Sequence, residues 1–187
     1  MQHKLRQHIE QVISLTDSEF AFVLSHFTLQ KAKKRESLIQ EGERVAYVYF
    51  VASGLLKLVY GDASGREFIV SFAMEGWWES DFYAFFTKTR ATMSLQCMED
   101  TVVYGISLEN YHRLCAGLQK MEHFFLEKSN RGHIASQQRI LSFLRLNAKE
   151  RYERLLEQYP ALLQRVPKTL IASYLGVSRE TLSRIFS

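Results

Sequence analysis

The sequence of 187 residues has little of the material from which small secreted domains are built. Its two cysteines, Cys97 and Cys115, are too few for a disulfide framework, and they leave no zinc or iron–sulfur ligand spacing. Only two prolines, together with 47% hydrophobic residues, exclude a disordered or collagen-like chain. No uninterrupted apolar run approaches the roughly 20 residues of a membrane helix. These absences predict a globular protein without a membrane segment, located in the reducing cytoplasm.

Histidines and catalytic motifs are also missing where an enzyme would need them. No histidine occurs between Glu36 and Ser107, and the GxSxG, HExxH and P-loop motifs are absent. A metal-dependent enzyme on a β-barrel, which is the enzymatic alternative, would need histidines on its strands. We therefore predict no catalytic residue, no metal site and no enzyme. Haem binding is left open by four isolated histidines on helical segments, His26, His112, His123 and His133.

The positive charge is concentrated in the second part of the chain. Residues 1–107 contain 11 Lys and Arg against 13 Asp and Glu, a net charge of −2. Residues 108–187 contain 13 against 7, a net charge of +6. A basic C-terminal part beside a nearly neutral N-terminal part predicts that the basic part meets a polyanion.

The middle of the chain has the pattern of an antiparallel β structure. Five runs rich in β-branched and aromatic residues predict strands at 47–52, 55–60, 67–72, 91–97 and 101–106. The glycine-bounded segment 61–65 predicts a hairpin loop between two of them. Before the strands, residues 5–30 predict short helices, the second capped by Thr16 or Asp17, and the basic run 31–35 predicts a solvated loop.

Helical spacing returns after Ser107 and continues without a proline to Pro160, which predicts long helices. One apolar stripe is formed by Ile134, Ile140, Leu141, Phe143, Leu144 and Ala148. Small residues that would allow close packing against a second copy lie on another face, at Gly132, Ala135 and Ser136. The alternative is that the stripe packs on the chain's own barrel.

The last twenty residues, 168–187, predict a helix-turn-helix. Its inward positions are Ile171, Leu175, Val177, Leu182 and Ile185. Ala172 is small where the helices would cross, Gly176 allows the tight turn, Pro167 suits the first turn of the first helix, and Ser178 suits the cap of the second. The alternative is a three-helix packing module with an ordinary charged face.

The second of these helices has a polar face that suits duplex DNA. At about 100° per residue, one arc contains Arg179, Glu180, Ser183 and Arg184. Arginine donates to guanine and glutamate accepts from cytosine in the major groove, so these side chains can read base edges. Phosphate contacts are expected from residues near the helix N-termini, Lys168, Thr169, Ser178 and Thr181.

Several motifs together resemble one protein family. They are Glu41-Gly42-Glu43, the run 47–51, Ser53-Gly54 with Lys57, and Val177–Ile185. With them the chain resembles the Crp/Fnr family of bacterial transcription regulators over nearly its whole length. The resemblance implies an α+β fold with an N-terminal antiparallel β-roll, the double-stranded β-helix of cyclic-nucleotide-binding type, and flanking helices. It also implies a long dimerisation helix and a C-terminal winged-helix-type helix-turn-helix.

The same resemblance implies three domains and four kinds of partner. A sensor domain is expected at 1–120, a dimerisation helix at 121–146 and a DNA-binding domain at 147–187. The expected partners are double-stranded DNA, a second copy, RNA polymerase and an unknown small effector. Family members usually continue beyond the position of Phe186-Ser187. The alternative function is therefore a ligand-sensing or protein-binding β-roll whose shortened DNA-binding module no longer functions.

Family members that bind cyclic AMP use a Glu for the ribose hydroxyl and an Arg for the phosphate. The corresponding pocket here consists of Gly76, Ser80, Asp81, Arg90 and Thr92. Ser80-Asp81 replaces the family's Gly-Glu and Ala91 replaces its Arg, so we expect no bound cofactor and weak or no cyclic nucleotide binding. Arg90 is expected to be solvated, and the alternative is that a one-residue shift of its loop lets it reach an anion. Core packing is expected for the neighbouring aromatic residues, and the alternative is that they stack on an unknown ligand. They are Trp77, Trp78, Phe82, Tyr83, Phe85 and Phe86.

Overall fold

The computed structural model describes residues 1–185, and the expected end of the second helix at Phe186-Ser187 lies outside the described residues, as does the side chain of Ile185. The chain divides into two compact units, residues 1–128 and 129–187. The first unit contains α1 (Gln2–Glu10), α2 (Asp17–Ser25), α3 (Phe82–Thr87), α4 (Leu108–Gly117) and the start of α5 (Lys120–Arg145). The second contains the rest of α5, α6 (Ala148–Gln158), α7 (Pro160–Arg165), α8 (Lys168–Tyr174) and α9 (Arg179–Ile185).

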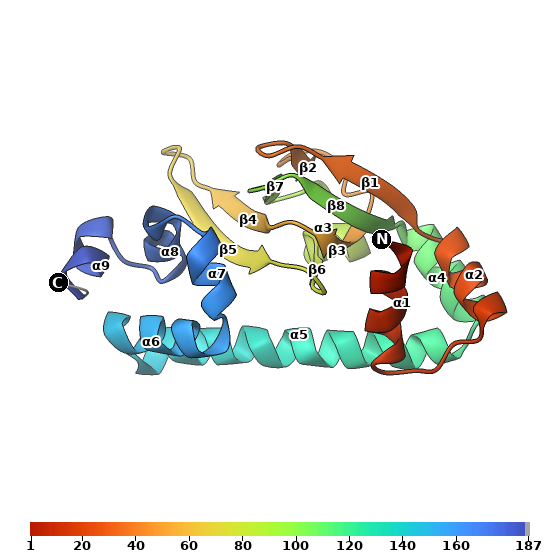
Figure 1. Cartoon of the computed structure of the whole chain (residues 1–187). Coiled ribbons are helices and arrows are strands. Elements are labelled where there is room, and N and C mark those ends of the chain that lie inside the picture. The colour runs from red at the N-terminus through yellow and green to blue at the C-terminus, as the bar shows by residue number, and fades with distance from the viewer. Residues whose placement is uncertain (186–187) are drawn as a thin grey trace. The chain divides into compact units, whose positions relative to one another are not determined.

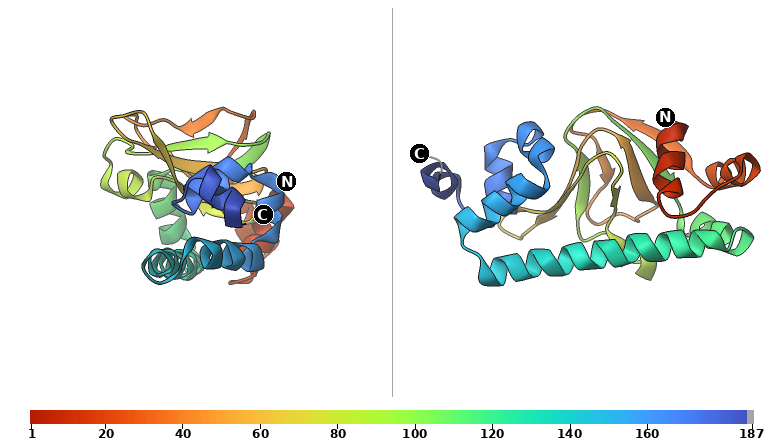
Figure 2. Two further views of the ribbon diagram at one scale, coloured as in Figure 1. Left: turned by 90° about the vertical axis from the view of Figure 1, so that its left-hand side faces the viewer. Right: turned by 60° about the horizontal axis from the view of Figure 1, so that its bottom comes forward.

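The first unit is an antiparallel β-roll of two four-stranded sheets (Figures 1 and 2). One sheet has the order β1-β8-β3-β6 and the other the order β2-β7-β4-β5. The eight strands are β1 (Thr28–Ala32), β2 (Ser37–Ile39), β3 (Val48–Ser53), β4 (Leu56–Gly61), β5 (Glu67–Ala73), β6 (Trp78–Glu79), β7 (Ser94–Cys97) and β8 (Thr101–Ile106). The five expected strands are confirmed, with β7 beginning three residues later than the predicted run.

Three further strands, β1, β2 and β6, were not expected from the sequence. The prediction of a loop at 31–35 is wrong at its start, because Lys31 and Ala32 belong to β1. They pair with Val102 and Thr101 of β8. The turn between β1 and β2 begins only after Ala32. Lysine on such a strand keeps its charged end in water while its backbone continues the ladder.

The central strand β3 separates two hydrophobic cores. Successive side chains of a strand point to opposite faces. Val48 and Phe50 therefore pack with the helices, in a core that includes Leu5, Ile9, Met121 and Phe124. Tyr49 and Val51 pack toward the second sheet, in a core that includes Leu56, Leu58, Leu95 and Val103. Because both faces of β3 are covered, almost every residue of this strand is apolar.

Local signals explain where the helices and turns begin. Thr16 caps α2, and Glu19 returns the contact to the backbone of Thr16, which is a full capping box. Gly54 has φ +108°, and a side chain there would collide with the backbone of Thr101. Only glycine therefore fits the connection between β3 and β4.

The second unit is helical, and within it α8 and α9 are short and joined by a tight turn. The buried residues of this unit are Leu155, Leu162, Val166, Ile171, Ala172, Leu175 and Leu182.

The prediction of the apolar stripe is wrong at Ala148, because α5 ends at Arg145 and Asn147 caps the next helix. Between residues 129 and 185 no strand is present, so the winged part of the expected fold has no counterpart there. No helix in the described chain is long and apolar enough to span a membrane.

Candidate functional site

The turn from β6 into α3 is built around the carboxylate of Asp81. This side chain is fully buried and caps α3, because its Oδ1 accepts a hydrogen bond from the backbone N–H of Ala84 at 3.0 Å. Its Oδ2 accepts from the backbone N–H of Thr92 at 2.8 Å and from the Thr92 hydroxyl at 3.0 Å. Two predicted pocket residues, Asp81 and Thr92, are thus brought together by direct contact.

A second acid, Glu79, lies inside the roll two residues earlier. It pairs in register with Tyr49 of β3, whose side chain belongs to the core between the sheets. Its carboxyl accepts from the hydroxyl of Ser71 at 2.6 Å and from the N–H of Ser80 at 3.1 Å. Burial raises the pKa of Glu79 to about 7, against the lowering effect of these two hydrogen bonds. Sequence reasoning missed Glu79, since only the pairing of β6 with β3 places it inside.

The other predicted pocket residues are used by the fold in different ways. The hydroxyl of the buried Ser80 donates to the carbonyl of Tyr47 at 3.0 Å. Gly76 has φ +83°, a conformation that suits glycine. Arg90 is exposed and donates to the carbonyl of Gly42 at 2.7 Å. The structure therefore buries Ser80 and Asp81 and leaves Thr92 and Arg90 exposed, with Thr92 bonded to the buried carboxylate of Asp81.

The expected core packing of the aromatic group is wrong for half of its members. Phe85 is buried, and Trp77 and Trp78 are half-buried. Phe82, Tyr83 and Phe86 are exposed, with Tyr83 at 66%. The reason is that α3 has only six residues, and it buries the side of Ala84 and Phe85 while its other sides face solvent.

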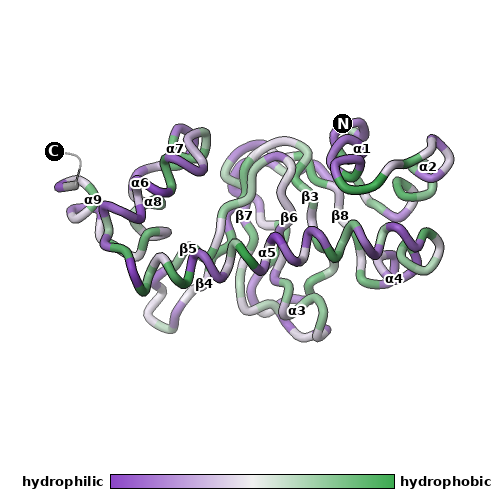
Figure 3. Tube along the Cα trace, turned by 90° about the horizontal axis from the view of Figure 1, so that it is seen from below, coloured by the Kyte–Doolittle hydropathy of each residue, from purple (hydrophilic) through white to green (hydrophobic). Residues whose placement is uncertain are grey.

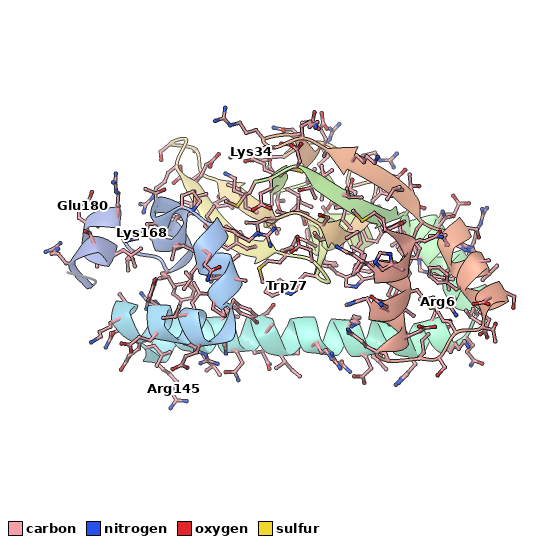
Figure 4. All side chains as sticks on the ribbon, in the orientation of Figure 1. Arg6, Lys34, Trp77, Arg145, Lys168 and Glu180 are labelled. Carbon is pink, nitrogen blue, oxygen red and sulfur yellow. The ribbon has the colours of Figure 1, made fainter. Side chains whose placement is uncertain are left out.

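In the second unit, α8 and α9 position the residues that the sequence assigned to DNA (Figure 4). Ile171, Ala172, Leu175 and Leu182 are buried, and Val177 is half-buried. Pro167 lies at the N-cap of α8, one position before the first turn in which it was expected. Ser178 accepts from the N–H of Thr181 at 3.1 Å, as expected of a cap.

The polar residues of this pair of helices face outward. Exposed side chains are those of Lys168, Thr169, Ser178, Arg179, Glu180, Ser183 and Arg184, whereas Thr181 is half-buried. The pKa of Glu180 is lowered, first by its own backbone N–H and then by the Ser178 hydroxyl, so the carboxylate is charged at neutral pH. The outward arc of α9 therefore presents two cations, one anion and hydroxyl groups.

The turn between α8 and α9 rests on the end of α5 through Phe143. Gly176 has φ +70°, and a side chain there would come within 3.0 Å of the Phe143 ring. The guanidinium of Arg151 lies over the same ring, 5.1 Å from its centroid. Sequence reasoning assigned Phe143 to a widened apolar stripe, and its contact with the turn had no sequence signal.

The fold and these contacts can now be set beside known proteins. The family model of the cyclic nucleotide-binding domain matches residues 29–117. The transcriptional regulatory protein btr of Bordetella pertussis is 27% identical over 169 residues, which are 84% of this chain and 69% of that protein.

Two solved structures have the same fold. The c-di-GMP responsive global regulator CLP of Xanthomonas campestris has a TM-score of 0.74 at 16% identity, over 91% of this chain and 90% of that chain. FixK2 of Bradyrhizobium japonicum has a TM-score of 0.72 at 21% identity, over 86% of this chain and 82% of that chain.

The β-roll of the first unit thus matches the family model of the cyclic nucleotide-binding domain, which covers residues 29–117. Over most of its length the chain is similar to transcription regulators, which confirms the resemblance that its motifs indicated.

Proposed function

We propose that this protein is a sequence-specific DNA-binding transcription regulator of the Crp/Fnr type, which acts in the cytoplasm as a homodimer. The observation that carries the proposal is the outward arc of α9, where Arg179, Glu180 and Arg184 are exposed. Leu182, on the opposite side of the helix, is buried. Such a helix can enter the major groove with its polar side while its apolar side remains anchored.

The exposed residues divide into two roles. Arg179 and Arg184 can each donate two hydrogen bonds to a guanine, and Glu180 can accept one from a cytosine. Lys168 and Thr169 begin α8 and are exposed, so they suit the phosphate backbone. The hydroxyls of Ser178 and Thr181 lie 3.1 Å apart at the start of α9 and are also assigned to phosphate oxygens.

Support for a dimer comes from the exposed side of α5 in the second unit. Figure 3 shows hydrophobic and hydrophilic residues alternating along this helix. At about 100° per residue, four exposed apolar residues share an arc of about 120°, and a fifth, Phe143, lies beside this arc and contacts the turn between α8 and α9. The four are Ile134 (57% exposed), Ile140 (60%), Leu141 (41%) and Leu144 (76%). The half-buried Arg139 and Ser142 lie on the opposite side. A second copy of α5 would cover this arc and place two reading helices on one two-fold site.

The proposal is tested by selecting binding sites from random duplexes and titrating the preferred site against random DNA. We expect a preferred site with two-fold symmetry, bound at least about a thousandfold more tightly than random duplex. The binding stoichiometry should be two chains per duplex. If no site is enriched, the better interpretation is a ligand-sensing β-roll without a working DNA module. RNA polymerase is the proposed downstream partner.

A further inference from the structure

The predicted ligand pocket holds an anion of its own, the buried carboxylate of Asp81, which is bonded to the exposed residue Thr92. Thr92 offers two hydrogen-bond donors, its backbone N–H and its hydroxyl, and both point to Oδ2 of Asp81. The remaining carboxylate oxygen of Asp81 is held by the N–H of Ala84. An N–H or O–H donates one good hydrogen bond, so these three donors are committed to a buried carboxylate.

The charge around this point is unfavourable for a second anion. A cyclic nucleotide carries one negative charge on its phosphodiester, and burial of an anion requires donors or a cation. The carboxylate of Asp81 is buried here, and Ala91, a small apolar residue, belongs to the core between the sheets. The nearest arginine in the sequence, Arg90, is exposed and bonded to the carbonyl of Gly42. The residues therefore do not fit the ligand for which the domain family is named.

We propose that Asp81 closes this β-roll to cyclic nucleotides, because its carboxylate occupies the hydrogen-bond donors of Thr92 that a bound phosphate would need. Asp81 is then a specificity-determining residue, which replaces an external anion by an internal one. The inference concerns the first unit alone and does not depend on whether α9 reads DNA.

The competition between Asp81 and a ligand can be tested with two substitutions. One adds an arginine at position 91, and the other removes the carboxylate of Asp81. Asp81→Ser keeps a side chain that can cap α3 but removes the charge and the reach to Thr92. Ala91→Arg adds a guanidinium at a position whose side chain belongs to the interior. The control for charge is Asp17→Ser, because Asp17 is on α2 and its side chain is 93% exposed.

Isothermal titration calorimetry with cyclic AMP on the full chain gives the decisive comparison. We expect no saturable binding to the unchanged protein and at least tenfold tighter binding to Asp81→Ser/Ala91→Arg than to Asp17→Ser/Ala91→Arg. Thermal unfolding establishes that both double variants are folded. Equal affinity, or no binding by either folded double variant, would overturn the proposal, as would micromolar binding to the unchanged chain.

A second measurement needs no gain of binding and covers the case in which Asp81→Ser does not fold. The milder variants Asp81→Asn and Thr92→Val each weaken the contact between these side chains. If the contact exists as described, the two changes together raise the unfolding equilibrium constant by clearly less than the product of their separate effects. Independent effects would show that Asp81 does not hold the donors of Thr92, and the proposal would fall.

Discussion

The guanidinium of Arg139 lies over the ring of Tyr174, with its central carbon 3.7 Å from the ring centroid. The same guanidinium donates to the backbone carbonyl of Tyr174 at 3.0 Å and lies 4.9 Å from the centroid of Phe143. Arg139 is on α5 and Tyr174 is the last residue of α8. This contact fixes the end of α8, and therefore the turn into α9, against the long helix.

Replacing Arg139 should loosen α8 more than it disturbs α5. Arg139→Ala removes a cation–π contact and a charge-assisted hydrogen bond, so we expect a loss of about 2–3 kcal/mol in the free energy of unfolding of the second unit. Denaturant unfolding gives the magnitude, and hydrogen exchange at the amides of α8 gives the location. Arg131→Ala, an exposed position on the same helix, is the control and should change stability by less than about 0.5 kcal/mol. Equal losses in the two variants would contradict the role given to Arg139.

Two glycine-to-alanine changes should have opposite signs. Gly176→Ala places a side chain in a left-handed turn and close to the Phe143 ring, which we expect to cost about 1–2 kcal/mol. Gly132→Ala lies within the exposed part of α5, where no atom comes within 4 Å of the new methyl group. It should stabilise the helix by up to about 1 kcal/mol. Melting temperatures of the two variants provide the comparison, and a shift of the same sign in both would refute the account of the turn.

Stability should fall with rising pH because of Glu79. Its folded pKa of about 7 exceeds the ordinary value of 4.5, so the folded state holds the proton more tightly than the unfolded state. The stabilisation is complete below pH 4.5 and is lost as pH rises toward and past 7, by about 2–3 kcal/mol between pH 5 and pH 8. Denaturant unfolding at a series of pH values measures the change.

Glu79→Gln is the matched variant for this pH dependence. It keeps the size of the side chain and can still contact Ser71 and the N–H of Ser80, but it has no proton to lose. The fall in stability between pH 5 and pH 8 should therefore be smaller in the variant by about the same 2–3 kcal/mol. Identical pH profiles for the two proteins would show that Glu79 does not titrate in this range.

The proposed dimer predicts a difference between two neighbouring positions of α5. Ile134→Glu puts a charge on the exposed apolar arc. Ala135→Glu puts it about 100° further round the helix, on the small-residue face that the sequence also offered for packing and that this interface does not use. Both positions are exposed. Light scattering of the unchanged protein should give twice 21.8 kDa, and at micromolar concentration only Ile134→Glu should give the monomer mass. A monomeric unchanged protein, or equal behaviour of the two variants, would rule out this interface.

The sequence predicted those parts of the fold whose signals are local. Apolar runs between glycines predict five strands of the roll. Thr16 and Glu19 form a complete capping motif within four residues, which predicts the start of α2. By contrast, β1 reads as polar because it is an edge strand with mostly exposed side chains, so its pairing with β8 could not be inferred. The exposed face of α3 was missed because hydrophobicity alone predicts burial.

The contacts that matter most for the candidate sites join residues far apart in the sequence. Arg139 and Tyr174 are 35 positions apart, and Asp81 meets Thr92 across α3. The departure of Asp81 from the family pattern was visible in the sequence. Its hydrogen bonds were not, because they depend on how the segment after α3 returns to the roll. The inward position of Glu79 likewise follows from strand pairing and not from composition.

The most direct test of the DNA-binding account compares Arg184→Ala with Lys168→Ala in binding titrations at several salt concentrations. Both side chains are exposed, so neither substitution should damage the fold. If Arg184 reads a base, its loss costs about 1–3 kcal/mol at the selected site and little on random duplex. If Lys168 meets only phosphate, its loss weakens both by similar factors and reduces the salt slope by about one unit per protomer. Equal ratios of specific to random binding in the two variants would contradict the assignment of α9 as the recognition helix.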